Sequence, residues 1–106
     1  MIKLLLKFLK LFSNGRWKVS CVVVKAGRVL STGYNKRIGN GKVVHAEMMA
    51  LGKLSPSEIK GSVVYCTWSP CIDCERVMRK MGVSEVRYIE EYSLNKPAQD
   101  LCRKIK

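Results

Sequence analysis

If the first stretch of the chain is a helix, apolar residues cover most of its surface and lysines form a narrow stripe. Lys3, Lys7 and Lys10 are separated by four and then three residues, which places them on one face of a helix. We therefore predict a helix over residues 1–12 whose apolar side packs against a sheet. A helix that lies on a membrane surface is the alternative. The lysines interrupt the apolar run, so it is neither a secretory signal nor a membrane span, which takes about 20 apolar residues.

Beyond this helix the chain alternates between strand-period and helix-period segments. Hydrophobic residues recur at every second position over 17–24, and a second short apolar segment follows a tight turn over 29–33. This pattern predicts an antiparallel hairpin. Ser69 and Pro70 mark the start of a later helix, and Gly82 marks its end. The predicted order is helix 1–12, strands 17–24 and 29–33, loop 34–42, helix 43–54, strand 62–66, helix 70–81, strand 83–89 and helix 97–105.

The order of these segments predicts the fold class. A strand, a crossover helix and a second strand between residues 62 and 89 imply parallel pairing with a right-handed connection. Together with the hairpin they give an α/β fold, a three-layer α/β/α sandwich around a mixed sheet of about four strands. The 106 residues contain no linker, repeat or low-complexity segment, which predicts a single compact domain over residues 1–106.

The charge of the chain is strongly positive and unevenly distributed. The sequence contains 20 Lys and Arg against 8 Asp and Glu, a formal net charge of +12 at pH 7. Ten of the basic residues and none of the acidic ones lie in the first 42 residues. Such a field attracts polyanions, so single-stranded nucleic acid or a nucleotide is the expected partner. A basic surface that is merely solvated is the alternative.

The five cysteines do not follow the regular spacing of a disulfide framework. Cys21, Cys66 and Cys102 each stand alone in an apolar segment, which is typical of buried thiols in a reducing compartment. We therefore expect a cytoplasmic protein. Cys71 and Cys74 differ from them, because they lie three residues apart at the start of a predicted helix.

This pair of cysteines presents both sulfurs on one face of the helix, where the free N–H groups of the first turn stabilise thiolates. Such a pair is either half of a zinc site or a redox-active dithiol. His45, the only histidine of the chain, favours zinc, because one imidazole and two thiolates leave the fourth tetrahedral position for water. We therefore expect one Zn²⁺ per chain, held by His45, Cys71 and Cys74.

Glu47 follows His45 by two residues, and this spacing suggests its role. Residues i and i+2 of a regular helix point about 200° apart, so the two share a site only at the first turn. We therefore expect two helix N-termini to converge on the metal. Zinc lowers the pKa of bound water toward about 7, and Glu47 would carry the proton to the leaving amine. The alternative is a closed structural zinc site with Cys66 as fourth ligand. In such a site Glu47 would have no chemical role.

The segments His45–Glu47 (His-Ala-Glu) and Pro70–Cys74 (Pro-Cys-Ile-Asp-Cys) resemble the H-x-E and P-C-x-x-C signature of the zinc-dependent cytidine and deoxycytidylate deaminase superfamily. The resemblance extends over nearly the whole chain. It implies a cytidine deaminase-like fold, three zinc ligands in these segments and Glu47 as the proton shuttle. The superfamily usually has a fifth strand after the last helix. The sheet is thus expected to have four strands or five, or an edge that is open to a second copy in a homo-oligomer.

Three branches of the superfamily share parts of the remaining pattern. Residues 67–71, Thr-Trp-Ser-Pro-Cys, resemble polynucleotide cytosine deaminases. Residues 33–39 and 45–51 resemble tRNA adenosine deaminases, and residues 33–35 equally resemble deoxycytidylate deaminases. The adenosine deaminases, however, usually have Glu at the position of Ser69, and the deoxycytidylate deaminases commonly have Asn at the position of Met49. By this resemblance the expected substrate-binding residues are Tyr34, Asn35, Lys36, Arg37, Ala46, Trp68 and Ser69.

Several of these residues also have ordinary structural interpretations. Asn35 suits a turn, and Trp68 beside a strand end suits a core. Lys36 and Arg37 suit either a backbone phosphate or the 5′-phosphate of a nucleotide. The extended basic field favours a cytosine in single-stranded polynucleotide as substrate. A free dCMP-type nucleotide is the alternative, tRNA adenosine is third, and a zinc-stabilised nucleic-acid-binding module is the alternative without catalysis.

Overall fold

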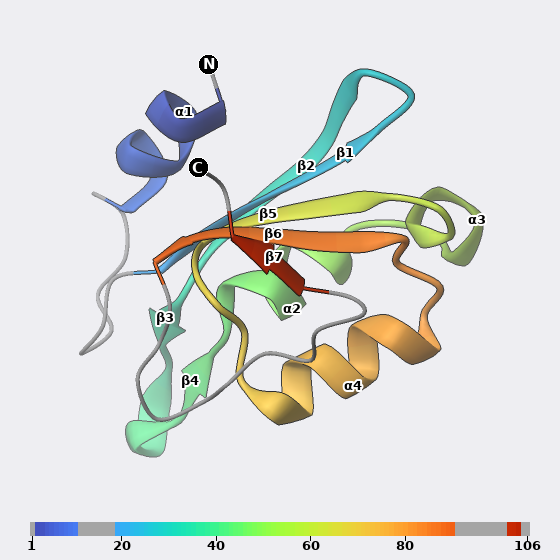
Figure 1. Cartoon of the computed structure of the whole chain (residues 1–106). Helices are drawn as coiled ribbons and strands as arrows, with labels where there is room; N and C mark the ends of the chain where they lie inside the picture. The colour runs from blue at the N-terminus through green and yellow to red at the C-terminus, as the bar shows by residue number, and fades with distance from the viewer. Residues whose placement is uncertain (1, 11–18, 91–101, 105–106) are drawn as a thin grey trace.

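A five-stranded sheet lies at the centre of the computed structural model, which describes residues 2–10, 19–90 and 102–104 (Figure 1). Its strand order is β2-β1-β5-β6-β7. β1 pairs antiparallel with β2 and β5, whereas β5, β6 and β7 run parallel. The elements are α1 Ile2–Lys10, β1 Ser20–Lys25, β2 Arg28–Tyr34, β3 Lys36–Arg37, the 3₁₀ turn η1 Gly39–Gly41, β4 Val43–Val44, α2 Ala46–Leu51, α3 Pro56–Ile59, β5 Val63–Trp68, α4 Ile72–Lys80, β6 Glu85–Glu90 and β7 Cys102–Lys104.

The hairpin of β1 and β2 forms as its turn residues predict. Ala26 and Gly27 have φ angles of 51° and 74°, and two positive φ values are what a tight turn between right-twisted strands requires. Lys25 pairs with Arg28 across this turn. The part of the predicted first strand that precedes residue 19 lies outside the described residues.

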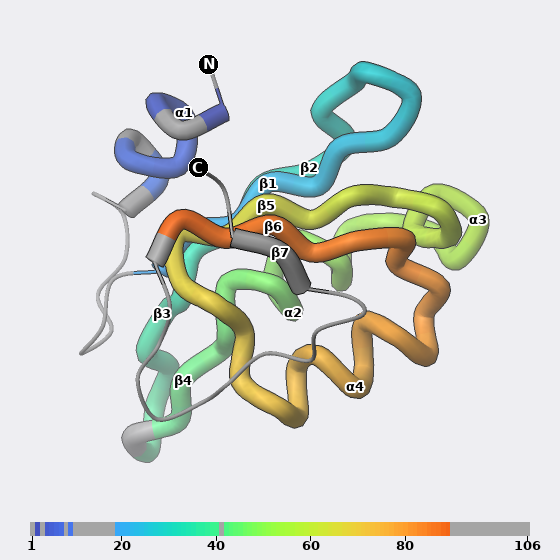
Figure 2. The backbone as a smooth tube through the Cα atoms, in the orientation of Figure 1, coloured from blue at the N-terminus to red at the C-terminus, as the bar shows by residue number. Residues whose placement is uncertain are grey.

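Helices cover both faces of the sheet, so the three-layer sandwich is confirmed (Figures 1 and 2). On one face, Leu6 and Leu9 of α1 pack against Val22. The hydroxyl of Ser20 donates a hydrogen bond of 2.5 Å to the carbonyl oxygen of Leu6, which fixes this helix to β1. Lys7 is exposed on the outward side of α1, as its spacing predicts. Within the described part of the chain, no helix is long and apolar enough to cross a membrane.

The opposite face carries α2 and α4 side by side (Figure 1). The parallel pair β5 and β6 is joined through α4, as the strand–helix–strand order predicts. The larger core lies between these helices and the sheet, and its members are apolar side chains of both layers. The fully buried ones are Cys21, Val23, Ala46, Ala50, Val64, Cys66, Met78 and Val86.

The predicted helix 43–54 is wrong at both ends. Val43 and Val44 form a strand that pairs with Lys36 and Arg37, within the segment that was expected to be a loop. Two adjacent β-branched residues fit a strand better than a helix start. The helix ends at Leu51. After it, Ser55 does not stop a helix but caps a new one, α3.

Two further helix predictions need correction. α4 begins at Ile72 rather than at Pro70, and its N-cap is Cys71 instead of Ser69. The predicted helix 97–105 is contradicted over residues 102–104, which form strand β7 on the edge of β6. An unpaired strand edge offers a row of backbone hydrogen bonds that a short amphipathic pattern does not outweigh. The remainder of that predicted helix lies outside the described residues.

Candidate active site

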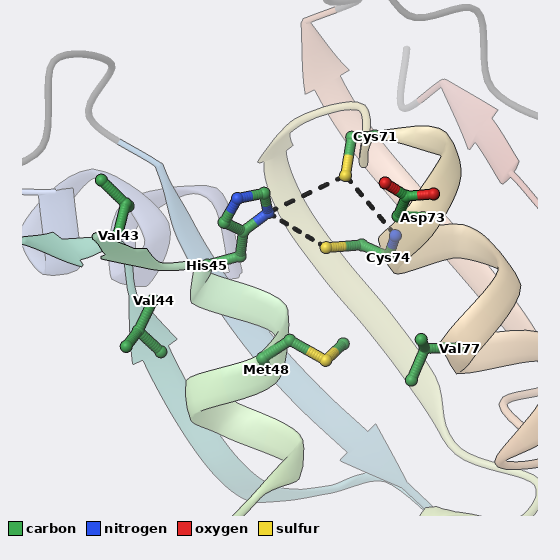
Figure 3. A pocket seen from close by; sticks show the side chains of 8 residues that line it. All are labelled: Val43, Val44, His45, Met48, Cys71, Asp73, Cys74 and Val77. Carbon is green, nitrogen blue, oxygen red and sulfur yellow. Dashed lines mark hydrogen bonds between the residues drawn. The ribbon is translucent and has the colours of Figure 1, made fainter. Parts of the chain in front are cut away.

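Two helix N-termini meet at the end of the sheet where β5 finishes. His45 is the N-cap of α2, with an extended backbone at φ −71° and ψ 148°, and Cys71 is the N-cap of α4. The Nδ1 atom of His45 lies 3.1 Å from Sγ of Cys74 and 3.8 Å from Sγ of Cys71 (Figure 3). The candidate ligand atoms of these three residues all lie within 4.8 Å of one another.

This donor set suits a zinc ion, because zinc binds imidazole nitrogen and thiolate sulfur in tetrahedral sites. Burial, and next the negative charge of Glu47, raise the pKa of the Cys74 thiol far above its usual range. A bound cation is therefore what would favour the thiolate here. Cys66, the fourth ligand of the alternative closed site, lies against Cys21 instead, with 3.8 Å between the two sulfurs. The described residues thus offer three donors and leave one coordination position.

Glu47 lies beside this group in the first turn of α2 and is only 4% exposed. Burial raises the pKa of its carboxyl group above the ordinary value. Hydrogen bonds with its own backbone N–H and with Cys74, and the charge of His45, act in the opposite direction. A buried carboxyl group with a raised pKa, held next to a candidate metal site, is typical of a general acid or base.

An open pocket of about 320 Å³ adjoins the group (Figure 3). Its wall includes Met48, Asp73 and Val77, which were not among the predicted site residues. Helical spacing would have found two of them, because Met48 follows His45 and Val77 follows Cys74 by three residues, on the same helix faces. The lining residues are Val43, Val44, His45, Met48, Cys71, Asp73, Cys74 and Val77.

The family model of the cytidine and deoxycytidylate deaminase zinc-binding region matches residues 1–90. The chain belongs to this family. It is a zinc-dependent deaminase of the cytidine and dCMP type, a hydrolase, with a group of side chains suited to one zinc ion.

Deoxycytidylate deaminases of bacterial viruses are among the relatives of this deaminase. The deoxycytidylate deaminase of Enterobacteria phage T2 is 25% identical, over 79% of this chain and 74% of the relative. The crystal structure of dCMP deaminase from cyanophage S-TIM5 in apo form is 32% identical, with a TM-score of 0.77, over 95% of this chain and 91% of that chain. The same cyanophage enzyme in complex with dCMP and dUMP is 31% identical, with a TM-score of 0.72, over 98% of this chain and 96% of that chain.

The predicted substrate-binding residues of the deaminase differ in how far they are buried. Asn35 is buried, and both its backbone N–H and its Oδ1 bond to the backbone of Val19, at 3.0 Å and 2.9 Å. Asn35 does not have the positive φ that a turn residue can adopt, and its contact with substrate stays a prediction. Ala46 and Ser69 are buried, and Tyr34 and Trp68 are half-buried. Lys36 and Arg37 are exposed on β3, opposite Val44 and Val43 of the pocket wall.

Proposed function

We propose that the deaminase acts on dCMP or a closely similar cytosine nucleotide and releases ammonia to leave the uracil nucleotide. The observation that carries this proposal is the similarity to the cyanophage dCMP deaminase over almost the full length of both chains. The basic charge alone favours a polynucleotide substrate. The relatives that span most of the chain favour the free nucleotide instead, because they are deaminases of dCMP.

In this proposal His45, Cys71 and Cys74 hold the metal ion. When bound, zinc supplies an activated water at neutral pH. Glu47 accepts one proton of this water at its carboxylate and delivers it to the ring nitrogen of the base. It then takes the remaining proton from the added hydroxyl group and passes it to the amine, which leaves as ammonia as the C–N bond breaks. Its burial excludes bulk water, so that the proton passes between the carboxyl group and the substrate rather than to solvent.

The exposed basic hairpin of β3 and β4 is the proposed contact for the 5′-phosphate. Lys36 and Arg37 are on its first strand, Lys42 precedes its second, and all three side chains are exposed. The hairpin continues directly into the wall of the pocket through Val43 and Val44. Cations at the rim of an apolar pocket fit a ligand with an uncharged base and a charged phosphate.

A cytosine in a single-stranded polynucleotide is the second candidate substrate. The ten basic residues among the first 42 support it, because a strand would release counterions along such a surface. A strand would be held by many phosphate contacts, so its turnover would fall steeply with salt. Turnover of a mononucleotide would depend on salt far less.

The test offers the zinc-loaded protein dCMP, deoxycytidine, a cytosine-containing single-stranded oligonucleotide and a stem-loop with an adenosine in its anticodon, in parallel. We expect dCMP to be converted fastest and deoxycytidine much more slowly, because it lacks the phosphate. Conversion of the oligonucleotide without conversion of dCMP would contradict the proposal and favour the second candidate. Zinc binding without release of ammonia from any of the four would favour a binding module.

A further inference from the structure

Gly33 of β2 lies directly beneath the backbone of α2. An ideal Cβ at this position would be 2.4 Å from the carbonyl oxygen of Ala46 and 2.7 Å from the amide nitrogen of Ala50. Real Cβ atoms essentially never come closer than 3.0 Å to such neighbours. Both neighbours are backbone atoms, which no change of rotamer can move. Only glycine therefore allows the helix to lie this close to the strand.

A second contact fixes the same helix on the same strand. The hydroxyl of Ser31 donates a hydrogen bond of 2.7 Å to the carbonyl oxygen of Ala50, and the pair is buried. Ser31 and Gly33 are two residues apart, so they lie on the same face of β2. Gly33 thus sets how close α2 approaches, and Ser31 holds the helix at that distance.

The strand that makes these contacts is connected through the sheet to the other half of the site. β2 pairs with β1, and β1 pairs with β5. Three residues after β5 the chain reaches Cys71, the N-cap of α4. The position of α2 on β2 therefore decides where its N-terminus lies relative to the two cysteines.

We propose that Gly33 and Ser31 are positioning residues for the deamination reaction, which act through α2 on His45 and Glu47. The proposal rests on the proposed function, in which His45 is a zinc ligand and Glu47 transfers protons. Ala46, whose carbonyl oxygen touches Gly33, stands between them in the sequence. A methyl group at Gly33 would have to push the start of α2 away by about 1 Å, and a displacement of that size lowers turnover by about 100-fold.

The test compares Gly33→Ala and Ser31→Ala with Val86→Ala. Val86 is fully buried in the same core, on β6, which two strands separate from β2, so its truncation lowers stability without moving α2. Three quantities are measured: thermal unfolding, zinc affinity by competition with a chelator, and kcat and KM for dCMP of the zinc-loaded protein.

We expect Gly33→Ala to weaken zinc binding by roughly 10- to 100-fold and to lower kcat by about 100-fold, with a smaller change in KM. Ser31→Ala should change both in the same direction but less. Val86→Ala should lose stability and keep the zinc affinity and kcat of the wild type.

Wild-type zinc affinity and kcat in Gly33→Ala would overturn the proposal, as would losses in Val86→Ala that match those of Gly33→Ala. If Gly33→Ala does not fold, the proposal is tested with Ser31→Ala alone. Its visible spectrum with Co²⁺ in place of zinc should differ from that of the wild type, and an unchanged spectrum with unchanged kcat would overturn the proposal. A wild-type chain without zinc affinity would instead overturn the proposed function itself.

Discussion

The N-terminus of α3 differs from the N-termini of α2 and α4 in how it is capped. At α3, the Ser55 hydroxyl accepts from the Glu58 amide at 3.3 Å, and the Glu58 carboxylate accepts from the Ser55 amide at 2.8 Å. At α2 the cap residue is His45, which makes no side-chain cap bond. At α4 the Cys71 sulfur accepts from the Cys74 amide at 3.4 Å. The helix away from the site has a full capping box, whereas the two helices at the site use the cap position for a candidate metal ligand.

This difference shows why the site lies at helix starts. An N-cap residue has an extended backbone, so its side chain reaches over the open end of the helix instead of following the helical spiral. His45 and Glu47 can therefore face one site although they are two residues apart. Replacing a good cap by a poor one costs about 1 kcal/mol of stability, so a helix that begins with His or Cys in place of Ser is expected to be less stable at its start.

The largest effect is expected from Cys71→Ser, which exchanges a candidate ligand for a better cap. Zinc binding and turnover should be lost, while the metal-free variant should unfold at the same temperature as the metal-free wild type or higher. Zinc content by atomic absorption and thermal unfolding of the stripped proteins check both parts. A variant that retains one tightly bound zinc would show that Cys71 is a cap and not a ligand.

Removal of the buried acid next to the caps should have the second largest effect. Glu47→Ala should lower turnover of dCMP by about 10²- to 10⁴-fold, which is the usual contribution of a general acid–base group, with zinc content unchanged. Glu58→Gln, at the cap of α3, is the matched control and should turn over normally. Near wild-type turnover in Glu47→Ala would exclude the proton-transfer role.

The capping box of α3 should contribute to stability and not to activity. Ser55→Ala should lower the free energy of unfolding by about 1 kcal/mol, measured by urea denaturation, with zinc affinity and turnover unchanged. Ser84→Ala, the same change at an exposed position in a loop, should have little effect. A loss of turnover in Ser55→Ala would show that the cap of α3 also affects activity, which would contradict the difference between this helix and the other two.

The smallest effect concerns pH. Hydrogen bonds from Ser55, first from its backbone and then from its side chain, lower the pKa of Glu58 below its ordinary value of 4.5. A lowered pKa in the folded state adds stability above the unfolded pKa, and this stability is lost as the pH falls through the folded pKa. The difference in unfolding free energy between the wild type and Glu58→Gln should therefore shrink between pH 6 and pH 3. A constant difference would contradict the capping box.

Much of the fold follows from local patterns. The β1–β2 hairpin, the parallel β5–α4–β6 unit and the docking side of α1 are each determined by periodicity and turn residues in one stretch of sequence. The start of α2 and the strand at 102–104 are different, because each depends on a partner strand elsewhere in the chain. Val43 and Val44 are in a strand because Lys36 and Arg37 lie beside them, which no window along the sequence reveals.

The reactive residues of the site could be predicted from the sequence, but the packing contacts that position them could not. The spacing of Cys71 and Cys74 and the single histidine indicate which residues come together. Gly33 could be matched to a family motif, yet its contact with the Ala46 carbonyl oxygen depends on where a helix crosses a strand. Sequence patterns carry the identity of reactive groups, whereas such close approaches appear only in three dimensions.

The most direct test of the central claim is the metal dependence of dCMP conversion. Purified protein with one zinc per chain should convert dCMP to dUMP with an equal amount of ammonia. Removal of the zinc by a chelator should stop the reaction, and one equivalent of zinc should restore it. Conversion that continues in the stripped protein, or a folded protein with one zinc that releases no ammonia from dCMP, would contradict the account.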